Sequence, residues 1–402
     1  MMSSIVRNQQ LTFLRIWEGL RPHVPADRNL PVRIQEALRR REFGSRDRRL
    51  YRELIYTALR YWPWMEELAA RDKDEAMRAV AWLAADTPAT QAVRETLLAG
   101  WPPLPPAISA RAERLAVNSR LLPDWFRSHC AAAFVPPNLE VLHSRAPLWI
   151  RLQTDVPDDV WAEFTDRGWR WRRSKTWPEA GEILDEADVT ATTAYHEGKF
   201  EIQDLGSQLV LASVEIPRGG RWLDACAGAG GKALQLGRLL GPDGRVDAFD
   251  VRTEALAELR QRAHRGGFTN IRTLARAPIG ADYDGVLVDA PCSGSGTWRR
   301  APHLKWCTTP ADIETQAGRQ QELLERFSRL VRPGGRLIYA TCSLSRQENQ
   351  RVVAAFLRTH PDFAALPPAR TFGGPTEDNG LVILPAQHDT DGFFAATLQH
   401  RR

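Results

Sequence analysis

Apolar residues recur every three or four positions along the first third of the chain. In RLYRELIYTALRYW (49–62) this spacing places leucine, isoleucine and tyrosine side chains on one face of a helix. Proline clusters at 101–109 and 134–140 cannot continue a helix, so they mark loops, and the second marks a domain boundary. The pattern predicts a helical domain over residues 1–135.

The pattern changes between residues 148 and 199. WIRLQT (149–154) alternates apolar and polar residues, as in a half-buried strand, whereas VWAEFTDRGW (160–169) has helical spacing. Later short pieces again favour strands. We therefore predict a small α/β module over residues 145–200.

After Gly206 helical and strand patterns alternate along the chain. Gly241 and the glycines that follow Pro333 suit the C-terminal caps of helices, where the backbone needs a positive φ angle. The predicted strands are 221–225, 245–250, 285–289 and 336–341. This alternation predicts an α/β fold with a doubly wound, mostly parallel sheet over residues 201–402.

Composition narrows the class of protein and of partner. The 402 residues are 43% apolar and include 14 Trp and 14 Phe, enough for several cores. A net charge of +5 favours an anionic partner, although an arginine-rich composition with only five lysines reduces the weight of that signal. The five cysteines form no CxxC pair, which argues against a zinc site, and no stretch has the features of a signal peptide or membrane span. We expect a cytoplasmic monomer that binds neither metal nor membrane.

The segment WLDACAGAGGK (222–232) passes from a predicted strand through a small-residue turn into a helix. Glycines let the backbone approach a ligand, and the helix N-terminus faces it. Asp250 ends the next strand, where a carboxylate accepts hydrogen bonds from ribose hydroxyls. A nicotinamide dinucleotide would suit both features, but the turn lacks GxGxxG spacing, and Asp224 would repel a pyrophosphate. The turn favours S-adenosylmethionine, with a plain tight turn as the alternative.

Two cysteines follow apolar runs: Cys292 in VLVDAPCSGSG (286–296) and Cys342 in LIYATCS (337–343). If the two strands are parallel neighbours, their ends lie roughly 5 Å apart, so both thiols and Asp289 would face one crevice. Such a pair suits methylation of carbon 5 of cytosine. One thiolate adds to carbon 6 and makes carbon 5 nucleophilic, an acid such as Asp289 assists at ring nitrogen 3, and a second group removes the carbon 5 proton. The competing interpretation is two buried, inert cysteines.

The segments assembled above, with others, resemble the RNA (cytosine-5) methyltransferases of the Sun/Nop family, especially the type that modifies the bacterial small ribosomal subunit. The resemblance implies a Rossmann-like methyltransferase domain, S-adenosylmethionine as cofactor and structured RNA, 16S ribosomal RNA in particular, as substrate. The matching segments are FEIQDLGSQ (200–208), DACAGAGGK (224–232), DGVLVDAPCSGSGTWRRAPHLKW (284–306), VRPGGRLIYATCSLSRQEN (331–349) and TDGFFAATL (390–398).

The resemblance also implies roles for single residues. Cys342 is implied to be the nucleophile, Cys292 to assist release of the product, and Asp289 to serve both cytosine and cofactor. Glu348 and Asn349 are implied to orient the nucleophile's loop. The implied substrate contacts are Gln203, Ser207, Arg300 and Lys305. The implied cofactor contacts, besides Asp289, are Asp224, Cys226, Ala227, Gly228, Ala229, Gly230, Gly231, Lys232, Asp250 and Arg252.

The chain departs from the family pattern at three places. Ala229 stands where the cofactor turn usually has proline, which removes a source of rigidity. IRTLARAPIG (271–280) contains no Asp to read the adenine amino group. Gln153 stands where the family commonly has Asn, two residues after Arg151.

The N-terminal helices, especially 43–62, resemble the RNA-binding helical domain of the antitermination factor NusB, and the module at 145–200 is expected to be RRM-like. The arginines between positions 39 and 49 would suit phosphate contacts. Two other functions stay open from the sequence. A DNA cytosine-5 methyltransferase would use Cys292 as the attacking thiol, and a non-catalytic RNA-binding or ribosome-assembly protein would keep the fold without the chemistry.

Overall fold

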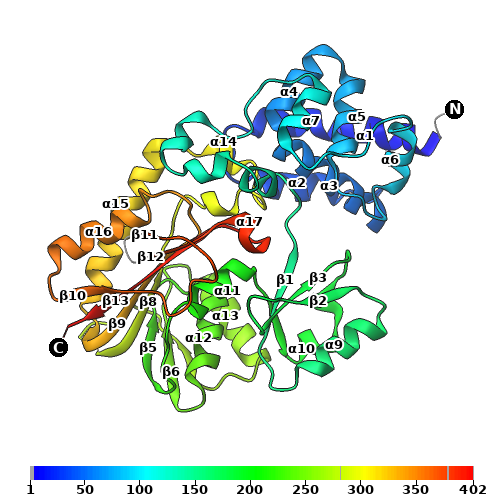
Figure 1. The fold of residues 1–402 in the computed structure, drawn as a ribbon. Coiled ribbons are helices and arrows are strands. Elements are labelled where there is room, and N and C mark those ends of the chain that lie inside the picture. The colour runs from blue at the N-terminus through cyan, green and yellow to red at the C-terminus, as the bar shows by residue number, and fades with distance from the viewer. Residues whose placement is uncertain (1–3, 281, 378–379, 402) are drawn as a thin grey trace. The chain divides into compact units, whose positions relative to one another are not determined.

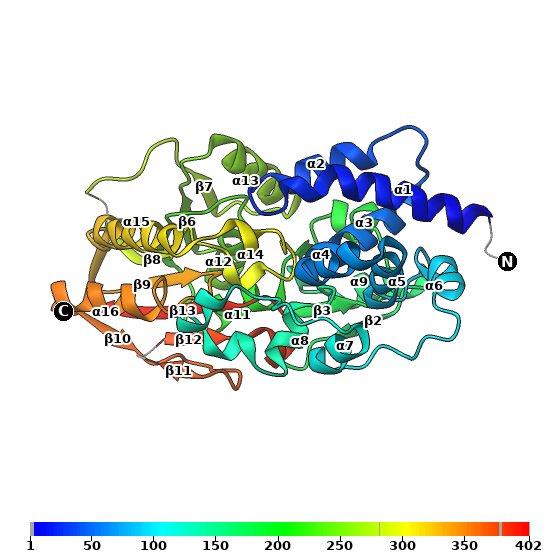
Figure 2. The same ribbon diagram turned by 90° about the horizontal axis from the view of Figure 1, so that it is seen from above.

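The described chain forms two units, and each takes residues from two separate stretches of sequence. The first contains the residues up to Arg145 together with Thr297–Pro310, and the second contains Ala146–Gly296 and Ala311–Arg402. The computed structural model describes residues 4–280, 282–377 and 380–401 (Figures 1 and 2). The module predicted at 145–200 and the large sheet therefore fall in one unit, which lacks residues 297–310.

In the residues that the structure describes, the first unit consists of helices and the loops between them. In α3, Leu50, Leu54 and Ala58 recur every four residues and are buried, so one stripe of the helix faces the core, as the periodicity predicts. The helices are α1 (Ser4–Leu20), α2 (Leu30–Leu38), α3 (Ser45–Arg60), α4 (Trp62–Arg71), α5 (Lys73–Leu83), α6 (Gln91–Leu97), α7 (Ile108–Leu115), α8 (Asn138–Leu142) and α14 (Leu304–Cys307).

The segment 297–310 completes the core of the first unit. The Trp298 side chain is fully buried and its ring centroid lies 4.5 Å from that of Phe126. Trp306, in α14, packs edge-on against Trp62 at 5.4 Å. Two indoles from a distant stretch of sequence therefore belong to the helical core, which the sequence pattern did not predict.

A small antiparallel sheet opens the second unit. Its strand order is β2-β3-β1-β4, with α9 between β1 and β2 and α10 between β3 and β4, which is the connectivity of the split β-α-β arrangement. Ile150, Phe164 and Phe200 are buried in its core. The elements are β1 (Leu148–Leu152), α9 (Pro157–Asp166), β2 (Trp171–Arg173), β3 (Ala180–Ile183), α10 (Thr193–His196) and β4 (Phe200–Ile202). The last strand runs two residues past the predicted limit.

The large sheet has nine strands in the order β11-β12-β13-β9-β8-β5-β6-β7, with β10 paired to β13. Helices separate its parallel strands along the chain. The strands are β5 (Gly220–Asp224), β6 (Gly244–Ala248), β7 (Ile271–Thr273), β8 (Tyr283–Asp289), β9 (Val331–Thr341), β10 (Phe363–Leu366), β11 (Thr376–Glu377), β12 (Gly380–Ile383) and β13 (Phe393–His400). The helices are α11 (Leu205–Ala212), α12 (Gly231–Leu240), α13 (Thr253–Arg265), α15 (Pro310–Ser328), α16 (Gln350–Thr359) and α17 (Pro385–His388).

The α/β class predicted for this region is confirmed, but the sheet is mixed rather than mostly parallel. Strands β5 to β9 pair in parallel, as expected for strands joined by helical crossovers. Strand β13 instead lies antiparallel to β9, β10 and β12, and β11 pairs antiparallel with β12. The antiparallel strands β10 to β13 were not predicted, because the prediction rested on the alternation of strands and helices.

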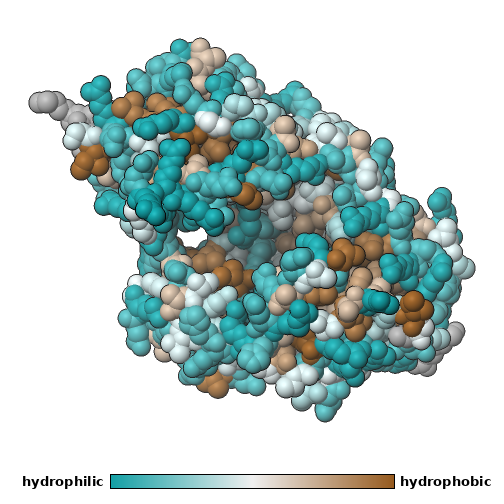
Figure 3. Space-filling model, turned by 180° about the vertical axis from the view of Figure 1, so that it is seen from behind, coloured by the Kyte–Doolittle hydropathy of each residue, from teal (hydrophilic) through white to brown (hydrophobic). Residues whose placement is uncertain are grey.

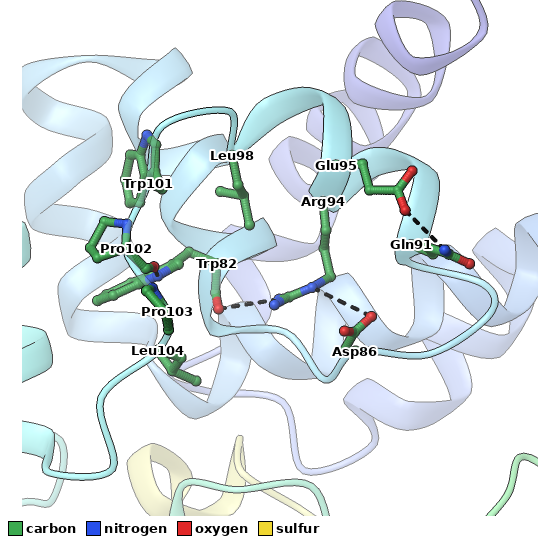
Figure 4. Close-up of a pocket in the computed structure, with 10 residues that line it drawn as sticks. All are labelled: Trp82, Asp86, Gln91, Arg94, Glu95, Leu98, Trp101, Pro102, Pro103 and Leu104. Carbon is green, nitrogen blue, oxygen red and sulfur yellow. Dashed lines mark hydrogen bonds and ion pairs between the residues drawn. The ribbon is translucent and has the colours of Figure 1, made fainter.

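A pocket of about 380 Å³ lies within the first unit, between the end of α5, α6 and the proline-rich loop that follows (Figure 4). Arg94 donates to the carbonyl oxygens of Ala81 and Ala84, each at 2.7 Å, so its guanidinium holds the loop after α5. None of the predicted site residues lines this pocket. The pocket is therefore separate from the residues that carry the predicted chemistry.

The described residues meet the requirements of neither a membrane-spanning helix nor a metal-binding group. On the face drawn in Figure 3, hydrophilic residues predominate, with apolar residues between them. Within the part of the chain that the structure describes, no helix is long and apolar enough to cross a bilayer. In the same residues, no three His, Cys, Asp or Glu side chains come together as a metal-binding group.

Candidate active site

The turn between β5 and α12 has the backbone shape that its small residues allow. Gly228 and Gly230 adopt φ angles of +52° and +92°, in the left-handed region. A Cβ at Gly230 would lie 2.1 Å from Cδ1 of Leu259, so the turn also needs the missing side chain. At Ala229, where a proline was expected, the carbonyl oxygen accepts a 2.8 Å hydrogen bond from Arg262. That contact holds the turn in place of the proline ring.

Asp250 lies beside this turn, just beyond β6. Its Oδ2 accepts a 2.8 Å hydrogen bond from the backbone N–H of Gly228, and its Oδ1 accepts from the backbone and side chain of Arg252 at 2.9 and 3.0 Å. Burial alone would raise the pKa of Asp250, but these hydrogen bonds outweigh burial and lower it. The structure thus holds a charged carboxylate against the glycine turn.

Lys232 and Asp289 form an ion pair at the other side of the turn. Lys232 lies in the first turn of α12, and its Nζ is 2.8 Å from Oδ2 of Asp289, at the end of β8. The same ammonium donates to Oγ of Ser207 at 3.1 Å and lies 5.3 Å from the ring centroid of Phe393. Burial would lower the pKa of Lys232, but Asp289 more than offsets it. Lys232 is therefore a buried, charged donor.

Asp224 ends β5 and is fully buried, and its Oδ2 has no hydrogen-bond partner among the described residues. Burial, reinforced by the charge of Asp289, raises the pKa of Asp224 to about 8. An unsatisfied carboxyl oxygen next to a glycine turn suits an ammonium donor on a ligand, and the α-amino group of S-adenosylmethionine is such a donor. The turn therefore fits the predicted cofactor.

Replacing Asp224 with asparagine is expected to flatten the dependence of stability on pH. The folded chain keeps the proton on Asp224 up to about pH 8, whereas the unfolded chain loses it near 3.8. Unfolding between these values releases a proton, so this group lowers the wild-type free energy of unfolding as pH rises, by up to about 1.4 kcal/mol per pH unit. Asparagine carries no such proton. Chemical denaturation at several values between about pH 5 and 8 measures both slopes, and equal slopes would contradict a proton on Asp224.

The two thiols lie together at the ends of adjacent parallel strands. Strands β8 and β9 pair with Asp289 opposite Ala340, and the chain reaches Cys292 and Cys342 two or three residues later. The two sulfur atoms are 3.3 Å apart, and both residues are partly exposed. The contact with Cys342, together with burial, raises the pKa of the Cys292 thiol. Cys292 is thus held as a neutral thiol beside Cys342.

The carboxyl group of Glu348 ties the two cysteine loops to each other. It accepts hydrogen bonds from the backbone N–H of Ser293 at 2.7 Å, from the Ser343 hydroxyl at 2.6 Å and from Gln320 at 3.2 Å. The hydroxyl of Ser293 also donates to it, at 2.5 Å. Asn349 adds a 2.8 Å hydrogen bond to the carbonyl oxygen of Ser343. Each serine follows one of the cysteines, so this buried group fixes the separation of the two thiols.

Comparison with known proteins identifies the family of the chain. The model of the family described as 16S rRNA methyltransferase RsmB/F matches residues 211–399. Ribosomal RNA small subunit methyltransferase B of Klebsiella pneumoniae is 31% identical over 299 residues, which cover 71% of this chain and 67% of that protein. The chain belongs to this methyltransferase family.

Other RsmB/F relatives and a solved structure extend the comparison. The protein of the same name from Vibrio cholerae is 33% identical over 65% of this chain, and the alignment spans 60% of that protein's length. The crystal structure of NSun6 from Pyrococcus horikoshii with SFG has a TM-score of 0.62 and 19% identity, and covers 69% of this chain and 97% of that one. At that identity the likeness is one of fold, and it agrees with a Rossmann-like methyltransferase domain.

Most of the predicted RsmB/F site residues lie around the glycine turn and the two strand ends. Cys226, which follows Asp224, has its thiol pKa raised by burial. Two predicted substrate contacts lie in the other unit. Arg300 is exposed there, whereas Lys305 is fully buried, with its Nζ 2.9 Å from both the carbonyl oxygen of Arg60 and Nε2 of His143. A contact between Lys305 and RNA would require the side chain to leave that position.

Some side chains in this site were not predicted. Phe393, which lies against Lys232, belongs to TDGFFAATL, so the motif marked the segment but not the contact. Ser293 and Gln320 bond Glu348, and nothing in their local sequence indicates it. Arg151 is fully buried and bonds Gln203, so it presents no charge to RNA in this structure.

Proposed function

We propose that the protein methylates carbon 5 of a cytidine in structured ribosomal RNA, 16S ribosomal RNA in particular, through a transient bond between Cys342 and the base. The observation that carries the proposal is the pair of sulfur atoms 3.3 Å apart at the strand ends beside the Lys232–Asp289 pair. Methylation of oxygen or of an exocyclic nitrogen needs neither thiol and would leave this arrangement unexplained. The names of the curated relatives, which are ribosomal RNA small subunit methyltransferases, support ribosomal RNA as the substrate.

S-adenosylmethionine supplies an electrophilic methyl group when bound. Gly228, Gly230 and the N-terminus of α12 would line its methionine end, Asp224 would accept from its ammonium, and Asp250 would take the ribose hydroxyls. The NSun6 structure named above was solved with SFG, an analogue of this cofactor, which supports the same choice. A ribose hydroxyl would have to share Asp250 with Arg252, whose guanidinium already bonds both carboxylate oxygens.

The chain's own residues then carry the covalent steps. Cys342, as a thiolate, forms a bond from Sγ to carbon 6, and the electron pair of the ring double bond becomes available at carbon 5. Asp289 and Lys232 form the hydrogen-bonding edge for the ring as charge develops on it. After methyl transfer a base takes the proton from carbon 5, the bond from sulfur to carbon 6 breaks, and the thiolate leaves. Cys292, whose sulfur lies 3.3 Å from that of Cys342, is the group that assists this release in the proposal.

We further propose that the helical unit, as a NusB-like domain, binds RNA phosphates. Six arginines between the end of α2 and the first turns of α3 are exposed, and such positions suit phosphate contacts. They are Arg39, Arg40, Arg41, Arg46, Arg48 and Arg49. The small sheet of the second unit, expected to be RRM-like, would present the RNA strand near the thiols.

The function is tested by bisulfite sequencing of total RNA from cells with and without the gene. One cytidine, in ribosomal RNA, is expected to lose its methyl group when the gene is absent. Calorimetric titration of the purified protein with S-adenosylmethionine is the companion measurement, and binding is expected. If no cytidine changes and no cofactor binds even with RNA present, the chain is a non-catalytic RNA-binding protein and the proposal is wrong.

A further inference from the structure

A chain of hydrogen bonds runs from the small sheet into the candidate active site, and its direction is fixed. It begins at Arg151 in β1, whose Nε donates to Oε1 of Gln203 at 2.6 Å. A guanidinium only donates, so Gln203 must turn its oxygen toward Arg151, because the flipped amide would set two donors against each other. Burial lowers the pKa of Arg151 to about 10, which still leaves it charged near neutral pH. The amide N–H group of Gln203 therefore faces the other way.

That amide donates to the hydroxyl oxygen of Ser207 at 3.1 Å. Lys232 donates to the same oxygen, also at 3.1 Å, and an ammonium likewise only donates. A hydroxyl oxygen has two lone pairs, so both are used. The hydroxyl hydrogen of Ser207 has no acceptor among the described residues, and the residue is partly exposed. Ser207 can therefore act toward a ligand only as a donor.

The position of this hydroxyl places it in the site. The ammonium of Lys232 that bonds it also bonds Asp289 at 2.8 Å, and a Cβ added to Gly231 in the cofactor turn would lie 3.8 Å from the amide nitrogen of Gln203. The groups that converge here, the hydroxyl and the ammonium, are both donors. Their complement is an oxygen that accepts.

We propose that Ser207 donates a hydrogen bond to an acceptor oxygen of the bound reactants, and that Arg151 and Gln203 are positioning residues that force this direction. The proposal rests on the proposed function, since the two candidate oxygens are the carbonyl of the target pyrimidine and the carboxylate of S-adenosylmethionine. Gln203 and Ser207 were predicted only as substrate contacts. The proposal makes Ser207 the hydrogen-bond donor to the ligand and Gln203 a residue that acts through Ser207.

The first test replaces Ser207 with alanine, with Ser213→Ala as the matched control. Ser213 caps the end of the same helix, where its hydroxyl donates to the carbonyl oxygen of Val210, away from this chain of hydrogen bonds. Ser207→Ala is expected to lower kcat/KM on unmodified small-subunit ribosomal RNA about 10- to 100-fold. An equal weakening of S-adenosylhomocysteine binding would identify the cofactor carboxylate as the acceptor, and unchanged binding would identify the pyrimidine. Loss below about threefold in both measurements overturns the proposal.

The second test changes the group of residue 203 that faces Ser207 from a hydrogen-bond donor to an acceptor and keeps the shape of the side chain. Gln203→Glu replaces the amide donor with an oxygen that accepts, so the Ser207 hydroxyl turns back to residue 203 and is lost to the ligand. Gln203→Glu alone is expected to lower kcat/KM as much as Ser207→Ala does. The double variant should lose no more kcat/KM than either single variant. If the two losses multiply, Gln203 does not act through Ser207 and its positioning role is wrong. If the wild-type protein is inactive but its cofactor affinity still responds to these changes, the proposed methylation is wrong and the role of Ser207 as a donor stands. If the wild-type protein is active and these changes have no effect, only the role of Ser207 is wrong.

Discussion

Cys342→Ala should abolish methyl transfer, and Cys292→Ala should leave a protein that accumulates RNA attached to it. Without the Cys342 thiolate no bond to carbon 6 forms, so the rate should fall by about 10⁴-fold or more. Without Cys292, whose sulfur lies 3.3 Å from that of Cys342, the bond forms but its release is slowed. Denaturing gel electrophoresis with labelled RNA detects the adduct, and release of 5-methylcytidine measures turnover.

Cys307→Ser is the matched control for this pair. The Cys307 thiol donates to the carbonyl oxygen of Val24 at 3.3 Å, within the helical unit, and a serine hydroxyl can keep that bond. The control should methylate at the wild-type rate and form no adduct. The opposite pattern, with an active Cys342→Ala protein and no adduct in Cys292→Ala, would make Cys292 the nucleophile, as in DNA cytosine-5 methyltransferases.

Glu348→Ala is expected to impair both stability and turnover although the side chain is fully buried. The change leaves the donors of Ser293, Ser343 and Gln320 without their acceptor. Leaving several buried donors unpaired should lower the free energy of unfolding by roughly 2–5 kcal/mol. With the loops no longer tied together, methyl transfer should fall about 100-fold, because reacting groups misplaced by about 1 Å lose that much.

Denaturant titration and turnover measure the two effects of Glu348→Ala, and Gln347→Ala serves as the neighbouring control. Among the described interactions, the Gln347 side chain accepts one hydrogen bond, from the exposed Arg351 side chain, and its backbone bond to Ser345 survives the change to alanine, so the loss should change little. If Glu348→Ala were as stable and as active as Gln347→Ala, the two cysteine loops would not depend on this carboxyl group.

The centre of the large sheet was predictable because buried strands are continuous apolar runs that end in recognisable residues. The predicted strand at 221–225 corresponds to β5, and those at 285–289 and 336–341 fall within β8 and β9. The short strand β7 and the C-terminal strands were missed. Their identity as strands depends on pairing partners far along the chain, as β13 pairs with β9, and local periodicity does not carry that information.

The same distinction applies to the candidate site. The meeting of Cys292 and Cys342 follows from two strand ends, so adjacency in a parallel sheet predicts it. The burial of Lys305 follows from a carbonyl group at Arg60 and a ring at His143, both more than 150 positions away in sequence. The sequence likewise does not indicate that Arg151 is fully buried and bonded to Gln203. From the sequence, a charged residue in a basic protein is predicted to be exposed. Its burial depends on contacts with residues far away in the chain, which the local sequence does not indicate.

Because residues 297–310 belong to the first unit, the core of that unit is completed late in translation. Residues up to Arg145 leave the ribosome first, yet Trp298 and Trp306 belong to their core and arrive much later. At typical translation speeds the delay is on the order of ten seconds. During that time the nascent helices keep apolar surface uncovered, and a chain that stops before Trp298 would lack both indoles of this core.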